Sequence, residues 1–404
     1  MLKGKTVVLG VSGSIAAYKM ANVASMLMKQ HCEVHVIMTA NAVNFIHPIT
    51  FETLTNHKCL VDTFDRNFQY NVEHVALAKK ADLMLIAPAT ANVIAKLAWG
   101  LADDMLSTTA LACTCKKVVA PAMNTRMYEN PVVQENMDRL RTFGFEVIAP
   151  ETGMLACKDV GAGKLPDEKT LLSYVYREIA CEKDLKGKRV LVTAGPTREA
   201  LDPVRYLTNH SSGKMGYAVA KACMLRGARV DLITGPTAIE PPPFVNVIRV
   251  TTAAEMMEAV QKQYQYADWI IKAAAVADYR PLTVSDEKLK KSQRNFSISM
   301  ERTEDILAFL GERRREGQFL CGFSMETQNM LENSRKKLRK KNLDMIVANN
   351  VKQEGAGFET DTNLVTLITE TEEISLPLMS KEEVAGRILD QILKAEEAGN
   401  HGRV

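Results

Sequence analysis

A repeated start constrains the fold of this chain more than any other feature. Leu2–Lys5 leads into an apolar run at residues 6–10, and the same four residue types at Leu185–Lys188 lead into a second run at residues 189–193. Such runs are typical of the first, buried strand of a parallel sheet. Because 404 residues are too many for one ordinary core, we expect two domains that begin alike, residues 1–188 and residues 189–404.

Strands and helices then alternate in both halves. Apolar strands are expected at 7–11, 34–38, 83–87 and 118–120, and again at 190–193, 230–234, 245–250, 269–273 and 345–348. Helical patterns lie between them, for example at 16–29, with a late hairpin at 365–376 and a closing helix at 381–397. This rhythm predicts an α/β protein with two doubly wound, Rossmann- or flavodoxin-like domains and mainly parallel sheets. Their ligands are expected beyond the carboxyl ends of the strands.

Composition excludes several functional classes. A formal net charge of +3 gives no overall field for nucleic acid, so we expect no nucleic-acid partner. The eight cysteines form no Cys-x-x-Cys pair, so reduced thiols of a cytoplasmic protein are expected rather than a zinc site. Neither a signal-peptide apolar region nor a run long enough for a membrane span is present, so no membrane association is expected.

A turn rich in Gly and Ser follows the first strand. Residues 10–15 read Gly-Val-Ser-Gly-Ser-Ile, and glycines, hydroxyls and helix N-terminal amides suit a phosphate group. The spacing is not the dinucleotide fingerprint Gly-x-Gly-x-x-Gly, so a plain structural turn is the alternative. Two further loops, at residues 87–92 and 121–128, follow neighbouring strands. All three can therefore line one pocket.

Together with residues 100–104, these segments resemble the flavin-containing cysteine decarboxylases, specifically phosphopantothenoylcysteine decarboxylase. The resemblance covers about residues 5–180 and implies bound FMN. Ser12 and Thr39 are the leading candidates for its phosphate. The full set of implied FMN contacts is Gly10, Ser12, Gly13, Ser14, Thr39, Ala87, Pro88, Thr90 and Ser107.

The resemblance also assigns the reaction to three residues. Loss of CO2 from a cysteinyl carboxylate leaves an unstabilised carbanion unless the flavin first oxidises the thiol-bearing carbon. By resemblance, His74 assists that oxidation, Asn124 recognises the carboxylate, and Cys157 on a mobile flap supplies a proton. From the residues alone, a structural histidine, a helix cap and a buried inert cysteine are the alternatives.

A second candidate phosphate cradle opens the other half. Residues 193–199 follow the strand, and the run Asp202–Gly216 opens a helix with hydroxyls, bare amides and one lysine. It is not a Walker loop. This run resembles phosphopantothenate–cysteine ligase, and the resemblance continues to the C-terminus.

The ligase resemblance implies a CTP site spread over the second half. Lys288 lies in a Lys-x-Lys-Lys motif, and the alternative for this motif is a solvated surface. Lys337 and Lys341 share a helix face. The alternatives for this pair are solvated charges or an RNA-binding patch. Phe323 contacts the base or packs in the core. The implied substrate- and nucleotide-binding residues are Ser211, Ser212, Gly213, Lys214, Ala273, Ala274, Ala275, Asp278, Lys288, Glu304, Asp305, Ile306, Leu307, Phe323, Lys337 and Lys341.

The implied ligation proceeds in two steps. The carboxylate of 4′-phosphopantothenate attacks the α-phosphate of CTP, and the amine of L-cysteine then displaces CMP, with Asn209 supporting the second step. Triphosphate chemistry implies Mg²⁺, although its ligands are not assigned. The family further implies a homo-oligomer, a dodecamer of decarboxylase trimers and ligase dimers.

Four residues depart from the family patterns. Ser14 and Lys158 replace Gly, Lys164 replaces Arg, and Glu304 replaces Pro. Because lysine lacks the bidentate fork of arginine, we expect the change at 164 to affect flap affinity or rate. A non-catalytic flavin-binding regulatory protein and an NAD(P) oxidoreductase are the competing functions; retention of His74, Asn124 and Cys157 disfavours the first, and the missing fingerprint disfavours the second.

Overall fold

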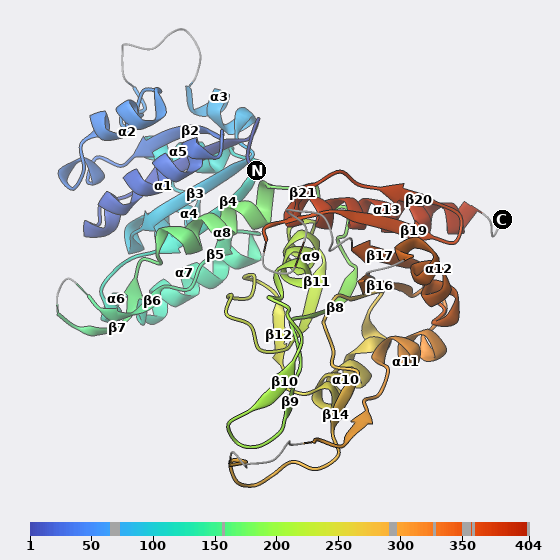
Figure 1. The fold of residues 1–404 in the computed structure, drawn as a ribbon. Coiled ribbons are helices and arrows are strands. Elements are labelled where there is room, and N and C mark those ends of the chain that lie inside the picture. Colours follow the sequence, from blue (N-terminus) through green and yellow to red (C-terminus); the bar gives the residue numbers. More distant parts are fainter. Residues whose placement is uncertain are drawn as a thin grey trace. The chain divides into compact units, whose positions relative to one another are not determined.

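The computed structural model describes residues 1–64, 73–155, 158–290, 297–325, 329–349, 357 and 360–401. The chain forms two compact units, Met1–Glu182 and Lys183–Val404, each with its own sheet (Figure 1). The division falls before residue 188 because the lead-in to the second strand packs on the second unit. Leu185 is buried there, and its N–H donates to the carbonyl of Arg226.

The first unit is built on a five-stranded parallel sheet in the order β2-β1-β3-β4-β5. The four strands expected here are confirmed, and a short edge strand, β5, adds to them. Because the chain adds β2 on one side of β1 and β3 on the other, the topology is doubly wound with its switch point between β1 and β3. The strands are β1 (Thr6–Val11), β2 (Glu33–Met38), β3 (Leu83–Ala89), β4 (Lys116–Pro121) and β5 (Glu146–Val147).

Helices cover both faces of this sheet, since alternate strand residues are apolar on both sides. One face packs on α1 (Lys19–Lys29), α2 (Pro48–Thr55) and α8 (Glu168–Ile179); the other packs on α3 (Glu73–Lys80), α4 (Ala91–Trp99), α5 (Met105–Ala112) and α7 (Pro131–Thr142). The helix expected at 16–29 begins with a separate 3-10 turn, η1 (Ile15–Tyr18). The remaining elements are η2 (Ala42–Asn44), α6 (Thr125–Tyr128) and the hairpin β6 (Glu151–Met154) with β7 (Val160–Lys164).

The second unit contains an eight-stranded sheet in the order β12-β11-β8-β13-β16-β17-β19-β20. The first six strands are parallel, and β19 and β20 form the expected antiparallel hairpin. The central strand β16 was not expected from the sequence. The strands are β8 (Arg189–Ala194), β11 (Arg229–Thr234), β12 (Asn246–Arg249), β13 (Trp269–Lys272), β16 (Phe319–Met325), β17 (Met345–Asn349), β19 (Val365–Thr369) and β20 (Glu373–Ser375).

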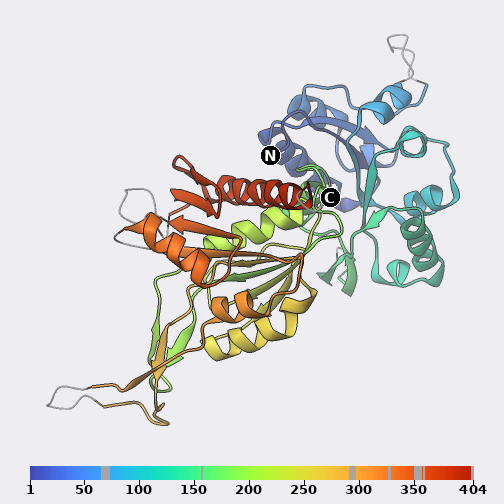
Figure 2. The same cartoon turned by 90° about the vertical axis from the view of Figure 1, so that its right-hand side faces the viewer.

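Two helix layers enclose the second sheet, as Figure 2 shows. On one face α9 (Lys214–Leu225) and α13 (Lys381–His401) lie side by side. The other face packs on α10 (Ala253–Gln263), α11 (Ile306–Arg313) and α12 (Met330–Lys340). Smaller elements complete the unit: η3 (Tyr264–Tyr266) and the strand pairs β9 (Arg198–Ala200) with β10 (Tyr206–Thr208), β14 (Tyr279–Pro281) with β15 (Met300–Arg302), and β18 (Thr362–Asn363) with β21 (Met379–Ser380). Within the described ranges, none of the helices combines the length and apolar character that a membrane crossing requires.

Candidate functional sites

A cavity of about 500 Å³ lies at the switch point of the first sheet. The loops after β1, β3 and β4 and the β6–β7 hairpin form its walls, as the doubly wound topology predicts. Four of the predicted residues line it: Gly13, Ser14, Thr90 and Asn124. Methionine and leucine side chains supply an apolar wall, from Met123, Met127, Met154 and Leu155. The cavity is therefore suited to an organic ligand with a few polar groups.

Asn124 is both a helix cap and a cavity residue. Its Oδ1 accepts the backbone N–H of Arg126 at 2.9 Å, which caps α6. Its Nδ2 donates to Oδ2 of Asp159 at 2.9 Å. Because the cap fixes the amide oxygen, the NH2 group is left to hold a carboxylate, and in this structure it holds one.

Ser12 joins two of the cavity loops. Its buried hydroxyl donates to the carbonyl of Pro88 at 2.6 Å and accepts the N–H of Thr90 at 3.0 Å. Both hydrogen bonds link the loop after β1 to the loop after β3. Ser12 thus holds these loops together, and its predicted contact with the FMN phosphate stays a prediction.

Thr39 provides the test of whether this sheet edge fits a phosphorylated cofactor. Its Oγ1 is buried and, among the described residues, has no hydrogen-bond partner. Leaving a buried hydroxyl unsatisfied costs about 1–3 kcal/mol, which a bound acceptor would recover. Nearby, a Cβ on Gly13 would lie 2.7 Å from Cβ of Asn41, so only glycine allows this close approach. The residues fit a phosphate group at this position.

Other predicted flavin residues have mainly structural contacts. A Cβ on Gly10 would face Leu106 at 3.1 Å, Ala87 is buried in the core, and the Ala87–Pro88 peptide is cis. Ser107 closes a capping box on α5, accepting from and donating to Asp104, and lines a separate cavity of about 420 Å³.

The two remaining decarboxylase residues are His74 and Cys157. His74 lies half-buried at the start of α3 and is not among the residues that line the 500 Å³ cavity. Cys157 lies outside the described residues. The flap sequence around it is visible on both sides. Lys158 adopts φ 67°, a conformation that favours the glycine usual in the family, and Lys164 pairs with Glu151 at 3.2 Å.

A second cavity of about 500 Å³ lies at the switch point of the second sheet, between β8 and β13. Loops that follow β8, β13, β16 and β17 form its wall. The structure brings together most of the predicted ligase residues here, namely Asn209, Ser211, Ser212, Gly213, Lys214, Ala273, Ala274, Ala275, Asp278, Phe323 and Lys337.

The start of α9 presents backbone donors to this cavity. Gly213 precedes the helix at φ 79° and provides no side-chain cap. The N-terminus of a helix favours a bound anion. Asn209 fixes the approach to this turn, because its Nδ2 donates to the carbonyls of Ala275 and Val276 at 3.2 Å each. The geometry is that of an anion site.

Four lysines make the second cavity strongly cationic: Lys214, Lys272, Lys337 and Lys381 line it together. Burial, together with Lys337 and Lys341, lowers the pKa of Lys272 to about 8. Burial and the charge of Lys214 lower the pKa of Lys381 to about 8. Burying these positive charges costs folding free energy, and a bound polyanion would offset that cost.

Sequence reasoning missed several residues of this wall, among them Lys272, Lys381 and Asn349. Oδ1 of Asn349 is buried and has no partner among the described residues. A lysine at the end of the apolar run 269–273 was a usable signal for Lys272. No pattern in the neighbouring sequence marks Asn349 or Lys381 as a residue of the cavity wall.

Lys288 is exposed and does not line the cavity. Its loop is nevertheless anchored, because the Leu289 N–H donates to Oδ2 of Asp202 at 3.1 Å, and Arg205 donates to the Leu289 carbonyl at 2.6 Å. Arg205, bonded to the same carboxylate, holds the pKa of Asp202 well below its usual range.

The segment at residues 304–307 divides between surface and core. Glu304 is exposed, Asp305 caps α11 and pairs with Lys341 at 2.5 Å, and Ile306 and Leu307 are buried. Lys341 follows the last residue of α12, so it reaches Asp305 while Lys337 reaches the cavity.

Comparison with known proteins matches both units. The family model described as DNA/pantothenate metabolism flavoprotein C-terminal domain matches residues 185–395, and the model described as flavoprotein matches residues 1–180. The coenzyme A biosynthesis bifunctional protein CoaBC of Bacillus subtilis is 47% identical over 396 residues, covering 97% of each chain. The protein of the same name from Escherichia coli K12 is 40% identical over 402 residues, covering 99% of each. The chain belongs to this family of bifunctional coenzyme A biosynthesis proteins.

Solved structures of smaller chains are also similar. The C-terminal domain of a coenzyme A biosynthesis bifunctional protein CoaBC shares 48% identity, covering 54% of this chain and 100% of that chain with a TM-score of 0.47. A mutant PPC decarboxylase complexed with pantothenoylaminoethenethiol shares 30% identity, covering 42% of this chain and 96% of that chain with a TM-score of 0.39. The family resemblance expected from the sequence is confirmed by the full-length relatives.

Proposed function

We propose that this chain carries out two consecutive steps of coenzyme A biosynthesis. Residues 189–404 ligate L-cysteine to 4′-phosphopantothenate with CTP, and residues 1–188 decarboxylate the product, 4′-phosphopantothenoylcysteine, to 4′-phosphopantetheine with FMN. One observation carries the proposal. Two cavities of different chemistry, one cationic and one largely apolar with a carboxylate-binding amide, each lie at the switch point of their own sheet.

The lysine cavity is suited to activating a carboxylate with a triphosphate. As the carboxylate attacks the α-phosphate of CTP, negative charge develops on the departing pyrophosphate, and preorganised cations stabilise it. Lys214, Lys272, Lys337 and Lys381 line the cavity, and the first-turn amides of α9 add donors. In this scheme the side chain of Lys288 moves toward the pyrophosphate, while the backbone of its loop is held at Leu289. Asn209 supports displacement of CMP by the cysteine amine.

The first cavity is suited to decarboxylation beside a flavin. When bound, FMN would supply oxidation of the thiol-bearing carbon, so that the electron pair left by the departing CO2 delocalises onto sulfur, and it would then supply the returning hydride that, with a proton, gives the saturated thiol. Thr39 and the loop of Gly13 and Ser14 would hold its phosphate. Asn124 orients the substrate carboxylate in place of Asp159, His74 assists the oxidation, and Cys157 returns a proton.

Three further properties belong to the proposal. Mg²⁺ accompanies CTP, and Asp278, which lines the lysine cavity, is available near it. The enzyme is a homo-oligomer, combining trimers of the first unit with dimers of the second. Because His74 is not among the residues that line the cavity of its own chain, a second copy would complete that site. A cytoplasmic location fits the seven described cysteines, which are all free thiols.

The flavin claim is tested by a Thr39→Val variant. Because Oγ1 has no partner among the described residues, its removal should leave the unfolding midpoint of the FMN-free protein unchanged or higher than that of FMN-free wild type. The wild-type protein should purify yellow, and the variant should lose FMN while remaining folded. A variant that keeps its full FMN absorbance would exclude Thr39 from the phosphate site.

The two-site claim is tested by separate assays of pyrophosphate and CO2. His74→Asn should stop CO2 release while pyrophosphate formation continues, and Lys288→Gln should do the reverse when phosphopantothenoylcysteine is supplied directly. Loss of both activities in either folded variant would contradict two independent sites.

A further inference from the structure

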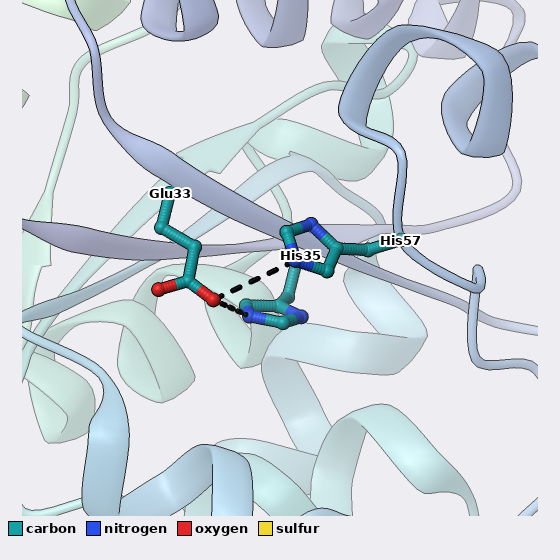
Figure 3. Close-up of side chains that lie close together, drawn as sticks. All are labelled: Glu33, His35 and His57. Atoms are coloured by element: carbon teal, nitrogen blue, oxygen red, sulfur yellow. Dashed lines mark hydrogen bonds and ion pairs between the residues drawn. The ribbon is translucent and has the colours of Figure 1, made fainter.

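Three side chains on the edge of the first sheet converge outside both cavities. Glu33 and His35 are alternate residues of the edge strand β2, so they lie on the same face, and His57 approaches from the segment after α2 (Figure 3). Their side chains are 33%, 16% and 35% exposed. The cluster is therefore sheltered but open to small solutes.

The distances match those between ligands of one metal ion. Oε1 of Glu33 lies 2.9 Å from Nε2 of His35 and 3.6 Å from Nε2 of His57. Two ligand atoms bound at zinc distances to a shared ion are separated by about 3.0–3.5 Å. The three side chains can each offer one ligand atom within 4.8 Å of the others. Binding an ion would require the ligand atoms to close to the separations given above.

The tautomer of His57 also favours a cation between His57 and Glu33. Its Nδ1 lies 3.1 Å from the carbonyl oxygen of Val34, which only accepts, so Nδ1 carries the hydrogen. In the neutral ring, Nε2 then directs a lone pair toward Oε1 of Glu33. Two lone pairs facing each other repel unless a cation or proton lies between them. A backbone carbonyl behind the distal nitrogen is the usual arrangement for a metal-binding histidine.

We propose that Glu33, His35 and His57 bind a divalent transition metal ion of the Zn²⁺ class, through one carboxylate oxygen and two Nε2 atoms, with water completing the shell. Imidazole with carboxylate selects Zn²⁺ and similar ions over Mg²⁺ and Ca²⁺. The cysteine spacing gave no hint of this site, because it contains no cysteine.

Lys80 is the competing cation. Its ammonium, at the end of α3, forms an ion pair with the same oxygen of Glu33. The side chain is 50% exposed, so it can move into solvent when a metal arrives. Metal binding would then cross-link β2 to the segment after α2 and release the end of α3 from β2.

The test is a titration of the full-length, chelator-treated protein with ZnCl2. Isothermal titration should show one tight site per chain, and Zn²⁺ but not MgCl2 should raise the unfolding temperature. His57→Gln should weaken that site by more than the roughly 10- to 100-fold typical for loss of an outer partner. Lys80→Met should tighten it by up to about fivefold, the scale of an exposed ion pair.

A matched control and a second variant keep the test decisive. His47→Gln removes an exposed histidine from the other end of α2 and should leave the site intact. Equal Zn²⁺ affinity in wild type and folded His57→Gln, or no saturable site in wild type, would overturn the proposal and leave only a carboxylate–imidazole ion pair. Should His57→Gln fail to fold, unchanged affinity in Lys80→Met would overturn it instead.

Discussion

Substitution of Gly216 by alanine tests how the start of α9 is placed on its sheet. Gly216 lies in the first turn of α9 and lines the lysine cavity. A Cβ there would lie 2.5 Å from Cβ and 3.1 Å from Cα of Ala194, at the end of β8. Carbon atoms pack at about 3.5–4.0 Å. The start of the helix, which carries the phosphate-binding amides, would therefore have to move away by about 1 Å.

The magnitude follows from two opposing effects. Gly→Ala in a helix interior stabilises by about 1 kcal/mol, whereas overpacking a buried contact costs about 1–3 kcal/mol. Gly386 in α13 is the matched control, because a Cβ there meets nothing within 4 Å. We expect Gly386→Ala to raise the free energy of unfolding and Gly216→Ala to lower it by up to about 2 kcal/mol.

Unfolding is followed by the fluorescence of Trp269, which is buried in the second unit, in a Trp99→Phe background. Misplacement of catalytic groups by about 1 Å costs roughly 100-fold in rate, so pyrophosphate release by Gly216→Ala should fall by that order. Decarboxylation of supplied substrate should be unaffected. If Gly216→Ala proves as stable as Gly386→Ala and ligates normally, the tight packing of α9 on β8 is refuted.

Three further outcomes are expected. Asn124→Ala should abolish CO2 release and lower stability by about 1 kcal/mol through the lost cap. Asn124→Asp should keep the cap but still fail in the CO2 assay, because it sets a second carboxylate against Asp159 instead of an amide donor. Because the pKa of Lys272 is lowered to about 8, CTP affinity measured by titration should weaken as pH rises above that value, and Lys272→Met should flatten the dependence. In wild type, the folding penalty of charged Lys272 applies fully below that pKa and fades as pH rises towards its ordinary 10.5. Asp202→Asn, which weakens the anchor of the Leu289 backbone, should slow pyrophosphate release with little change in the CTP dissociation constant. If the dissociation constant rises by the same factor as the rate falls, Asp202 does not act by positioning the loop.

Local patterns in the sequence determined the class of the fold and the edge at which ligands bind. Buried parallel strands read as short apolar runs, and helices between them alternate in a way that few other folds allow. The loops at residues 10–15, 87–92 and 121–128 were therefore predicted to share one edge, and Gly13, Thr90 and Asn124 do line one cavity. The strand β16 escaped notice because Gly322 and Ser324 interrupt its apolar run.

The chemistry inside the sites was decided by tertiary structure. Lys214, Lys272 and Lys381 are far apart in the chain, and only the strand order of the second sheet brings them to one cavity. Burial there lowers the pKa values of Lys272 and Lys381. The same holds for Glu33 and His57, which meet because α2 returns the chain to β2. Sequence periodicity encodes which residues are buried, but the distance and solvation that set a side chain's reactivity exist only once distant segments pack together.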